Sequence, residues 1–215
     1  MLMKKRSLRV CFALFCTLFL SVCFANQPYT IGAQYGVNFV SDYDFNSQTL
    51  DPKTKGTSSF SPGFFTQASL ARQIYPWYVI QLSAEYQSNN TRAAQLPSGE
   101  NITLYGNWSS YSLLAISILQ PVSPKRVSPY FGVGLGASYM DAYTKGEDVN
   151  FYIDDHSVYF VWQVEAGIKT RINERLSVVT QVQFFDIDVT HENTNSNQPR
   201  QYQNTAVTIG LNYQV

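Results

Sequence analysis

The sequence is poor in charge, and all of its cysteines lie near the start of the chain. Charged residues make up 14% of the 215 residues, against about 25% in an ordinary soluble domain. Cys11, Cys16 and Cys23 all precede Ala25. The longest later apolar run, Tyr130–Ala137, is far below the ~18 residues of a spanning helix. These shortages argue against a disulfide-stabilised secreted domain and against a helical membrane protein.

The first 25 residues have the pattern of a cleaved secretory signal peptide. Four basic residues come first, then an uncharged apolar run, then Cys23-Phe24-Ala25. A retained N-terminal helix is the alternative, but its apolar part is short for the ~20 residues that a span needs. Acylation of Cys23 would require a small residue where the chain has Val22. We therefore predict cleavage after Ala25 and one domain over residues 26–215.

Alternation of apolar and polar residues with a period of two recurs along the rest of the chain, which predicts β-strands. The predicted strands cover residues 29–40, 60–72, 77–88, 103–120, 129–141, 157–171, 175–187 and 203–215. The connections alternate between long and short, so four long loops share one end and three shorter turns share the other. The sequence therefore predicts an all-β fold, an eight-stranded antiparallel up-and-down barrel, whose last strand pairs with the first and the seventh.

The two faces of these strands predict which side meets lipid. One face carries Gly, Ser, Thr, Gln and Asn, which suit a narrow lumen, whereas a soluble barrel of the lipocalin type would point its apolar face inward. The other face is apolar; in 103–120 we assign Leu114, Ile116 and Ile118 to it, although Leu113 and Leu119 blur the pattern. Aromatic residues flank the apolar face near the short turns (Tyr29, Trp77, Tyr78, Phe131, Tyr213) and toward the long loops (Phe39, Phe64, Tyr86, Tyr139, Phe160, Phe184). Two aromatic belts around an apolar band predict a transmembrane barrel.

Two stretches carry a resemblance to a known family. The C-terminal "TIGLNYQV" is similar to the assembly signal of bacterial outer-membrane proteins, with Thr208, Gly210, Tyr213 and Val215 at its characteristic places. The usual last residue is Phe, so Val215 departs from the pattern. "SPYFGVGLGASY", residues 128–139, resembles the fifth strand of the small outer-membrane β-barrels, which include the opacity proteins and the transmembrane part of outer-membrane protein A. The resemblance implies an integral protein of the outer membrane of a Gram-negative bacterium.

Ionisable and amide side chains on the polar face predict a network inside the lumen. Its expected members are Glu85, Gln163, Glu165, Lys169 and Gln181. With the tight "INE" turn, residues 172–174, between the sixth and seventh strands, Trp162 should lie opposite Phe184, and Glu165 opposite Gln181. A structural network that plugs the lumen is the favoured interpretation, and a narrow pore is the alternative. An interior of eight strands is only just wide enough for side chains.

The long-loop end gathers the histidines and several acids. The same register places His156 near His191, with Asp154, Asp155, Asp186 and Asp188 close by. These residues are weak candidates for a divalent-cation site; a solvated acidic rim is favoured, so we expect no metal and no cofactor. A lipid A hydrolase would need His191, Glu192 and Ser196 to act together. That serine lies in a predicted loop, and Ser157 beside His156 is no better placed.

The favoured function is therefore that of a non-enzymatic surface protein with four long extracellular loops. It would serve envelope structure, adhesion or ligand contact. A narrow channel or carrier for small solutes and a lipid A-modifying hydrolase are the alternatives. The expected partners are outer-membrane lipid and lipopolysaccharide, the barrel-insertion machinery, and host or matrix ligands at the loops. We expect a monomer that binds no nucleic acid.

Overall fold

The computed structural model describes residues 28–41, 43–47, 54–95, 101–122, 126–146, 152–189 and 200–215. These residues form strands, and no helix among them is long and apolar enough to cross a membrane. The strands are β1 (Tyr29–Val40), β2 (Tyr43–Ser47), β3 (Thr54–Phe60), β4 (Gly63–Tyr75), β5 (Tyr78–Gln95), β6 (Asn101–Leu119), β7 (Val127–Gly146), β8 (Tyr152–Arg171), β9 (Leu176–Val189) and β10 (Arg200–Gln214). The predicted signal peptide, residues 1–25, lies outside the described residues.

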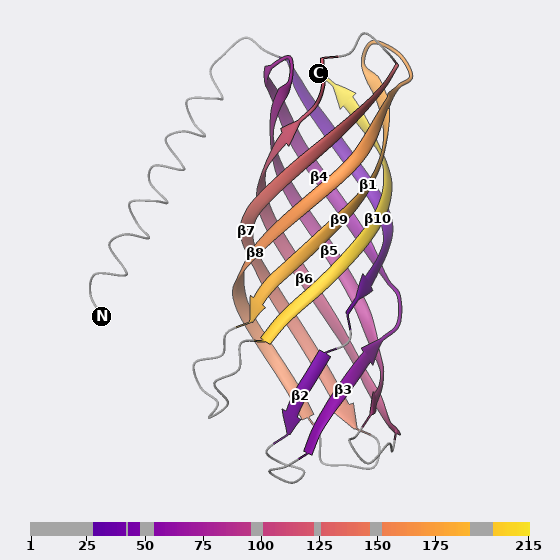
Figure 1. Cartoon of the computed structure of the whole chain (residues 1–215), viewed down its shortest axis with the longest axis vertical. Helices are drawn as coiled ribbons and strands as arrows, with labels where there is room; N and C mark the ends of the chain where they lie inside the picture. Colours follow the sequence, from indigo (N-terminus) through magenta and orange to yellow (C-terminus); the bar gives the residue numbers. More distant parts are fainter. Residues whose placement is uncertain are drawn as a thin grey trace, which may run out of the picture.

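Eight of these strands close into an antiparallel barrel, as the alternation predicted (Figure 1). The order around the wall is β1, β10, β9, β8, β7, β6, β5 and β4, and β4 returns to β1. The last strand pairs with the first, from Thr30 opposite Gln214 to Val40 opposite Asn204. It pairs on its other side with β9. Closure leaves no unpaired edge where all eight strands run side by side, up to Phe160 of β8, so the backbone groups of that part of the wall need no water.

The loop predicted over residues 41–59 is wrong in part, because β2 and β3 lie within it. These two strands pair with each other, and β3 pairs with the far end of β5. They continue the β1–β4 ladder in the same register, from Asn38 opposite Gly63 to Tyr43 opposite Ser58. The break at Ser61-Pro62 follows from the missing N–H of proline; there the Ser61 amide donates to the Asn90 carbonyl at 2.9 Å.

Other strands also run further than predicted: β5, β7 and β8 gain five to seven residues at the end that carries β2 and β3, whereas β4 and β7 gain only two or three residues at the opposite end. The end that carries β2 and β3 (Figure 1) is here called the loop end, and the opposite end, with residues 76–77, 120–122, 126 and 172–175, the turn end. β7 and β8 have 20 residues each. At about 3.3 Å per residue and a tilt of about 40°, such a strand rises roughly 50 Å, twice the ~25 Å of a membrane's apolar band. The wall is therefore much taller than the apolar band of a membrane.

The outward and inward faces agree with the prediction for most strands. Ile209, Leu211, Tyr213 and Val215 of β10 are exposed on the outside, while Thr208 is buried. The assignment for β6 is wrong: Leu114 is 0% exposed and Ile116 1%, so both point inward, whereas Leu113 is 56% exposed. β6 carries large apolar residues on both faces, which removed the contrast that the pattern needs.

The register predicted for β8 and β9 is also wrong, by two residues. Glu165 lies opposite Gln183, and Val164 opposite Phe184. The turn has four residues, Ile172 to Arg175, rather than three. The side-chain oxygen of Asn173 accepts hydrogen bonds from the amides of Arg175 and Leu176, at 2.9 and 2.7 Å. A shift of two keeps every side chain on its predicted face.

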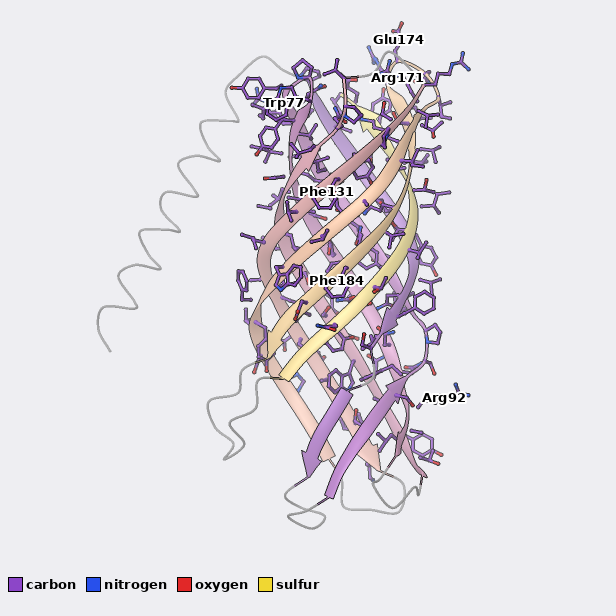
Figure 2. All side chains as sticks on the ribbon, in the orientation of Figure 1. Trp77, Arg92, Phe131, Arg171, Glu174 and Phe184 are labelled. Atoms are coloured by element: carbon purple, nitrogen blue, oxygen red, sulfur yellow. The ribbon has the colours of Figure 1, made fainter. Side chains whose placement is uncertain are left out.

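Aromatic side chains contact one another at two levels of the barrel, with Trp77 at the turn end and Phe184 nearer the loop end (Figure 2). At the turn end, Tyr75 and Trp77 stack with ring centroids 5.6 Å apart. The loop-end girdle, defined by Phe64, Tyr86, Tyr111 and Tyr139, is a chain of ring contacts with centroid separations of 5.4, 4.7 and 6.5 Å. On β8 and β9, the ring centroids of Trp162 and Phe184 lie 5.6 Å apart. These levels mark the interfaces of an apolar band.

Candidate functional site

A network of buried polar side chains crosses the lumen between the two girdles. The Gln67 amide donates to Ser83 at 2.6 Å and to Glu85 at 3.1 Å. Its carbonyl oxygen accepts from Gln181 and Gln183, both at 3.2 Å. Gln67 belongs to β4 and the two glutamines to β9, and β1 and β10 lie between these strands in the wall. The contacts therefore bridge the lumen rather than follow the wall.

Further side chains fill the same level. Gln163 donates to Glu165 at 2.9 Å, and the Tyr130 hydroxyl donates to Gln181. Phe65 and Phe185, again from β4 and β9, meet with ring centroids 5.6 Å apart. The middle of the barrel is consequently packed with side chains, as expected for eight strands.

Glycine is required at close contacts around this network. A Cβ on Gly132 would come within 2.7 Å of the Glu165 side chain, and a Cβ on Gly210 within 2.2 Å of the Ala33 carbonyl oxygen. Such separations are too short for any side chain, so a bulkier residue would push the strands apart. Gly132 therefore lets the Glu165 side chain lie against β7, and Gly210 lets the last strand lie close to β1.

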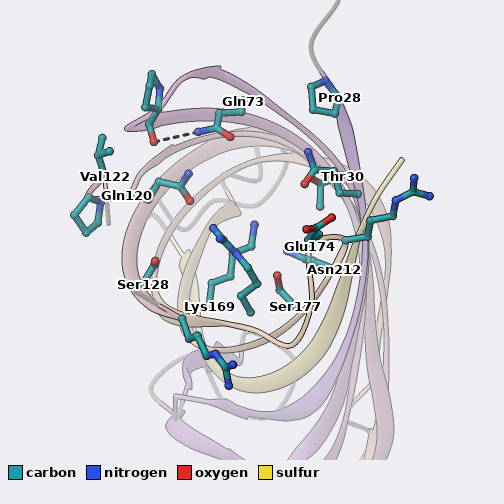
Figure 3. Close-up of a pocket in the computed structure, with 16 residues that line it drawn as sticks. Pro28, Thr30, Gln73, Gln120, Val122, Ser128, Lys169, Glu174, Ser177 and Asn212 are labelled. Atoms are coloured by element: carbon teal, nitrogen blue, oxygen red, sulfur yellow. Dashed lines mark hydrogen bonds between the residues drawn. The ribbon is translucent and has the colours of Figure 1, made fainter. Parts of the chain in front are cut away.

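Lys169 takes no part in the hydrogen-bonded network among the described residues. It lines a cavity of about 420 Å³ at the turn end, together with Arg126, Arg171 and Arg175 (Figure 3). A smaller cavity of about 60 Å³, lined by Glu165, Lys169 and Gln181 among others, adjoins the network below. The predicted network residues thus separate into a packed centre and a basic opening.

Beyond the loop-end girdle the wall continues as a projection with its own core. This part, the loop-end extension, consists of β2, β3, Ser88–Gln95, Asn101–Ser110, Met140–Gly146 and 152–157. Inside it, the Trp108 ring lies 5.2 Å from Phe60 and 5.6 Å from Tyr202. The Trp108 indole N–H donates to the Thr144 hydroxyl at 2.8 Å. Buried Leu104, Met140 and Ala142 complete an apolar core.

The outside of the extension is polar, in contrast to the wall below the girdle. Outward positions are paired across β5, β6 and β7: Ser88 with Ser109, Asn90 with Asn107, and Ser109 with Asp141. The Asn107 amide donates to Ser88 at 2.8 Å and to Asn90 at 3.2 Å. Tyr105 and Tyr143 stand among these residues with 56% and 45% of their surface exposed. Sequence reasoning missed this surface, although the alternation itself continues through it.

The candidate cation residues are only partly described. His156 lies 3.3 Å from Asp141 of β7, a partner that the sequence did not suggest. The described residues contain no group of three metal-ligating side chains that could hold an ion. The side chains of Asp154, Asp155 and Asp188, and all of His191, Glu192 and Ser196, lie outside the described residues. Ser157 points to the opposite face of β8 from His156, because neighbouring residues of a strand alternate.

The residues of the predicted assembly signal occupy the closing strand. Thr208 points inward and donates to Gln34 of β1 at 2.8 Å. Tyr213 and Val215 lie on the outside at the turn end, and the Val215 amide donates to the Tyr29 carbonyl at 2.8 Å. The segment therefore completes the ladder between the last strand and the first.

A closed barrel with an apolar outer band, two aromatic girdles and a polar lumen defines the class of transmembrane β-barrels. A family model described as "Outer membrane protein beta-barrel domain" matches residues 12–214. The chain belongs to this family and is an integral outer-membrane protein. No curated protein matches the sequence.

Solved structures of outer-membrane barrels are similar to this chain. Neisserial surface protein A has a TM-score of 0.54 at 13% identity, with 86% of this chain and 96% of that chain covered. OprG from Pseudomonas aeruginosa has a TM-score of 0.56 at 11% identity, with coverages of 88% and 96%. Ail, the attachment invasion locus protein of Yersinia pestis, has a TM-score of 0.49 at 13% identity, with coverages of 89% and 100%. At identities this low, Neisserial surface protein A and OprG establish a shared fold alone.

Proposed function

We propose that this barrel is a non-enzymatic surface protein whose loop-end extension faces the outside of the cell and contacts ligands there. The observation that supports the proposal is the extension itself, which has a polar outside and an apolar, aromatic core. This is the arrangement of a protein surrounded by water. A projection of this size is suited to reach beyond the lipid headgroups.

The two ends of the barrel support this orientation. Outer-membrane barrels have short turns on the periplasmic side and longer loops on the extracellular side. The turn between β4 and β5 has two residues and that between β8 and β9 has four, whereas β2 and β3 lie within the connection from β1 to β4. These connection lengths support an orientation with the loop end outside the cell.

The contact surface that we propose is the outward face of β5, β6 and β7 above the girdle. Tyr105 and Tyr143 offer large amphipathic rings, and Asn90 and Asn107 offer amide groups between them. Lys145 lies opposite Tyr105 and adds a positive charge. Tyrosines with adaptable polar neighbours are typical of contact surfaces, because the ring buries a large area at a low cost in conformational entropy.

A pull-down with the intact barrel in detergent micelles or nanodiscs tests this function. The bait is compared with a Tyr105→Ala/Tyr143→Ala double variant, and a Tyr75→Ala variant at the turn end serves as the matched control. Ligands of the outer surface, such as matrix proteins or glycans, should be retained by the parent barrel and by the control but lost from the double variant. Equal retention by all three barrels would contradict the proposed contact surface.

A narrow channel is the second candidate function, supported by the cavity at the turn end. The side chains that bridge β4 and β9 argue against an open path, since they occupy the middle of the lumen. Planar-bilayer conductance separates the two functions. The surface-protein proposal expects no steady single-channel current above the bilayer background, and a reproducible conductance that Gln67→Ala enlarges would favour the channel.

A lipid A hydrolase would need a nucleophile within reach of a base. Ser157 and His156 point to opposite faces of β8, so this pair offers no such arrangement. Mass analysis of lipid A from cells with and without the gene tests the activity directly. The surface-protein proposal expects identical lipid A, and loss of an acyl chain only where the gene is present would overturn it.

A further inference from the structure

The opening at the turn end is positively charged and hollow. Four cations, Arg126, Lys169, Arg171 and Arg175, line the cavity of about 420 Å³, and Glu174 is the acid among its described lining residues. Within the described part of the chain, none of the four cations has a carboxylate oxygen within 4.0 Å. The opening therefore carries an excess of positive charge that is not neutralised by ion pairs.

One of these positive charges, that of Lys169, lies inside the opening rather than at the surface. Lys169 lies on the inward face of β8, two residues from the turn-end limit of that strand at Arg171. It is partly buried and extends from the wall into the opening (Figure 3). A partly buried ammonium with no opposite charge is costly, and a bound anion would remove that cost.

The walls of the cavity offer hydrogen-bonding groups around the charges. Thr30, Ser128 and Ser177 contribute hydroxyls, and Gln73 and Asn212 contribute amides. A polar cavity with charge of one sign on its low-dielectric walls concentrates its field inside the opening. Its volume falls within the ~300–1,000 Å³ that is usual for sites of small ligands.

We propose that the turn-end cavity binds a phosphate-bearing anion, held by Lys169 and Arg171 with Arg126 and Arg175 at the rim. Guanidinium groups bind phosphate oxygens in pairs, and lysine supplies a compact charge. The phosphate comes either from a small solute that enters the opening or from a lipid headgroup at the adjacent interface. This site is separate from the contact surface proposed for the loop end, and a result that contradicts one proposal leaves the other unaffected.

Titration calorimetry of the purified full-length barrel in a zwitterionic detergent, with inorganic pyrophosphate as the probe, tests the site. We expect saturable 1:1 binding that weakens as salt is raised. Lys169→Gln and Arg171→Gln should each weaken binding by about tenfold or more, the effect of losing one charge-assisted hydrogen bond. Lys169→Arg, which keeps the charge, should retain most of the affinity.

Arg92→Gln is the matched control, because Arg92 is an exposed cation far from the opening at the loop end (Figure 2). It should bind pyrophosphate like the parent, and heat-modifiable mobility on gels confirms that each variant is folded. Absence of binding to the parent, or equal binding by all variants, would overturn the proposal.

Nanodiscs distinguish the two sources of phosphate. If pyrophosphate binds equally in discs of phosphatidylcholine and of phosphatidylglycerol, a soluble anion is the ligand. If phosphatidylglycerol abolishes pyrophosphate binding to the parent while Arg92→Gln behaves identically, the lipid headgroup occupies the site. Both results support a phosphate site.

Discussion

The two ends of a single strand show how the surroundings of the barrel decide its faces. Along β7, the outward residues between the girdles are apolar, such as Val133 and Leu135, both about half exposed. Past Tyr139 the outward residues are Asp141, Tyr143 and Lys145, while Met140 and Ala142 are buried inside. The period of two is unbroken, but the two faces exchange their chemistry. Lipid requires an apolar outside, and water requires an apolar inside.

The largest expected effect comes from the core of the extension. Trp108→Ala removes a buried ring from between Phe60 and Tyr202 and should destabilise the extension by about 3–5 kcal/mol. Amide hydrogen exchange along the loop-end parts of β5, β6 and β7 measures the loss. The exchange of β10 at the turn end should stay unchanged, since it lies outside this core. Thr103→Ala, an exposed position of the same strand, is the control and should change protection little.

The second prediction compares two outward positions of β8. Val164→Arg places a charge in the apolar band and should lower the free energy of unfolding by about 2–4 kcal/mol. His156→Arg, on the same face but in the extension beside Asp141, should change it by less than about 0.5 kcal/mol. Urea titrations of the two variants in lipid vesicles give the comparison. Equal losses would mean that both positions meet the same surroundings.

The third prediction concerns the polar lumen of the band. Gln67→Leu leaves Gln181 and Gln183 without their acceptor and removes one donor to Glu85. Each buried polar group left unpaired costs about 1–3 kcal/mol, so the same titration should show a loss of at least this size. Gln73→Leu, in which the side chain donates only to the Pro76 carbonyl at an exposed site, should be close to neutral.

The smallest effects are expected at the turn end of the last strand. Tyr213→Ala removes an exposed aromatic ring from the interface and from the assembly signal that the sequence resembles. It should lower the ratio of heat-modifiable to unfolded protein in outer-membrane fractions at matched expression. Val215→Phe should leave that ratio unchanged or raise it. If the ratio rose after Tyr213→Ala, this segment would not act as an assembly signal.

The sequence predicted the membrane-spanning part of the fold but ended the strands too early. Its criterion was an apolar outward face, and this criterion fails where the outward face becomes polar. The predicted strands ended at residue 88 in β5 and at 141 in β7, whereas the strands continue to Gln95 and Gly146; in β6 the predicted range already reached residue 103, close to the start of the strand at Asn101. Strand segments that lie outside the membrane lack an apolar outward face, so a search for that face alone treats them as loops. The β2–β3 hairpin lies largely in residues 41–59, which were predicted as one of the long loops.

The remaining errors have local causes. β6 has Leu113 and Leu114 side by side, so neither face stands out, and packing inside the lumen decided the orientation. The length of the turn after Arg171 depends on the hydrogen bonds that Asn173 makes with the amides after it. The identities of the polar lumen residues were readable from alternation, but the partners of Gln67 across the barrel depend on its closed shape.

Spin-label accessibility along β6 tests the exchange of faces most directly. The described residues contain no cysteine, so single cysteines at Leu113, Ser109 and Asn107 can each carry a nitroxide in a barrel reconstituted in lipid vesicles. The account predicts that oxygen, which concentrates in lipid, relaxes the label most at Leu113. A water-soluble nickel chelate should relax it most at Ser109 and Asn107, with the change between Leu113 and Ser109, where Tyr111 stands. High oxygen and low nickel accessibility at all three positions would contradict it.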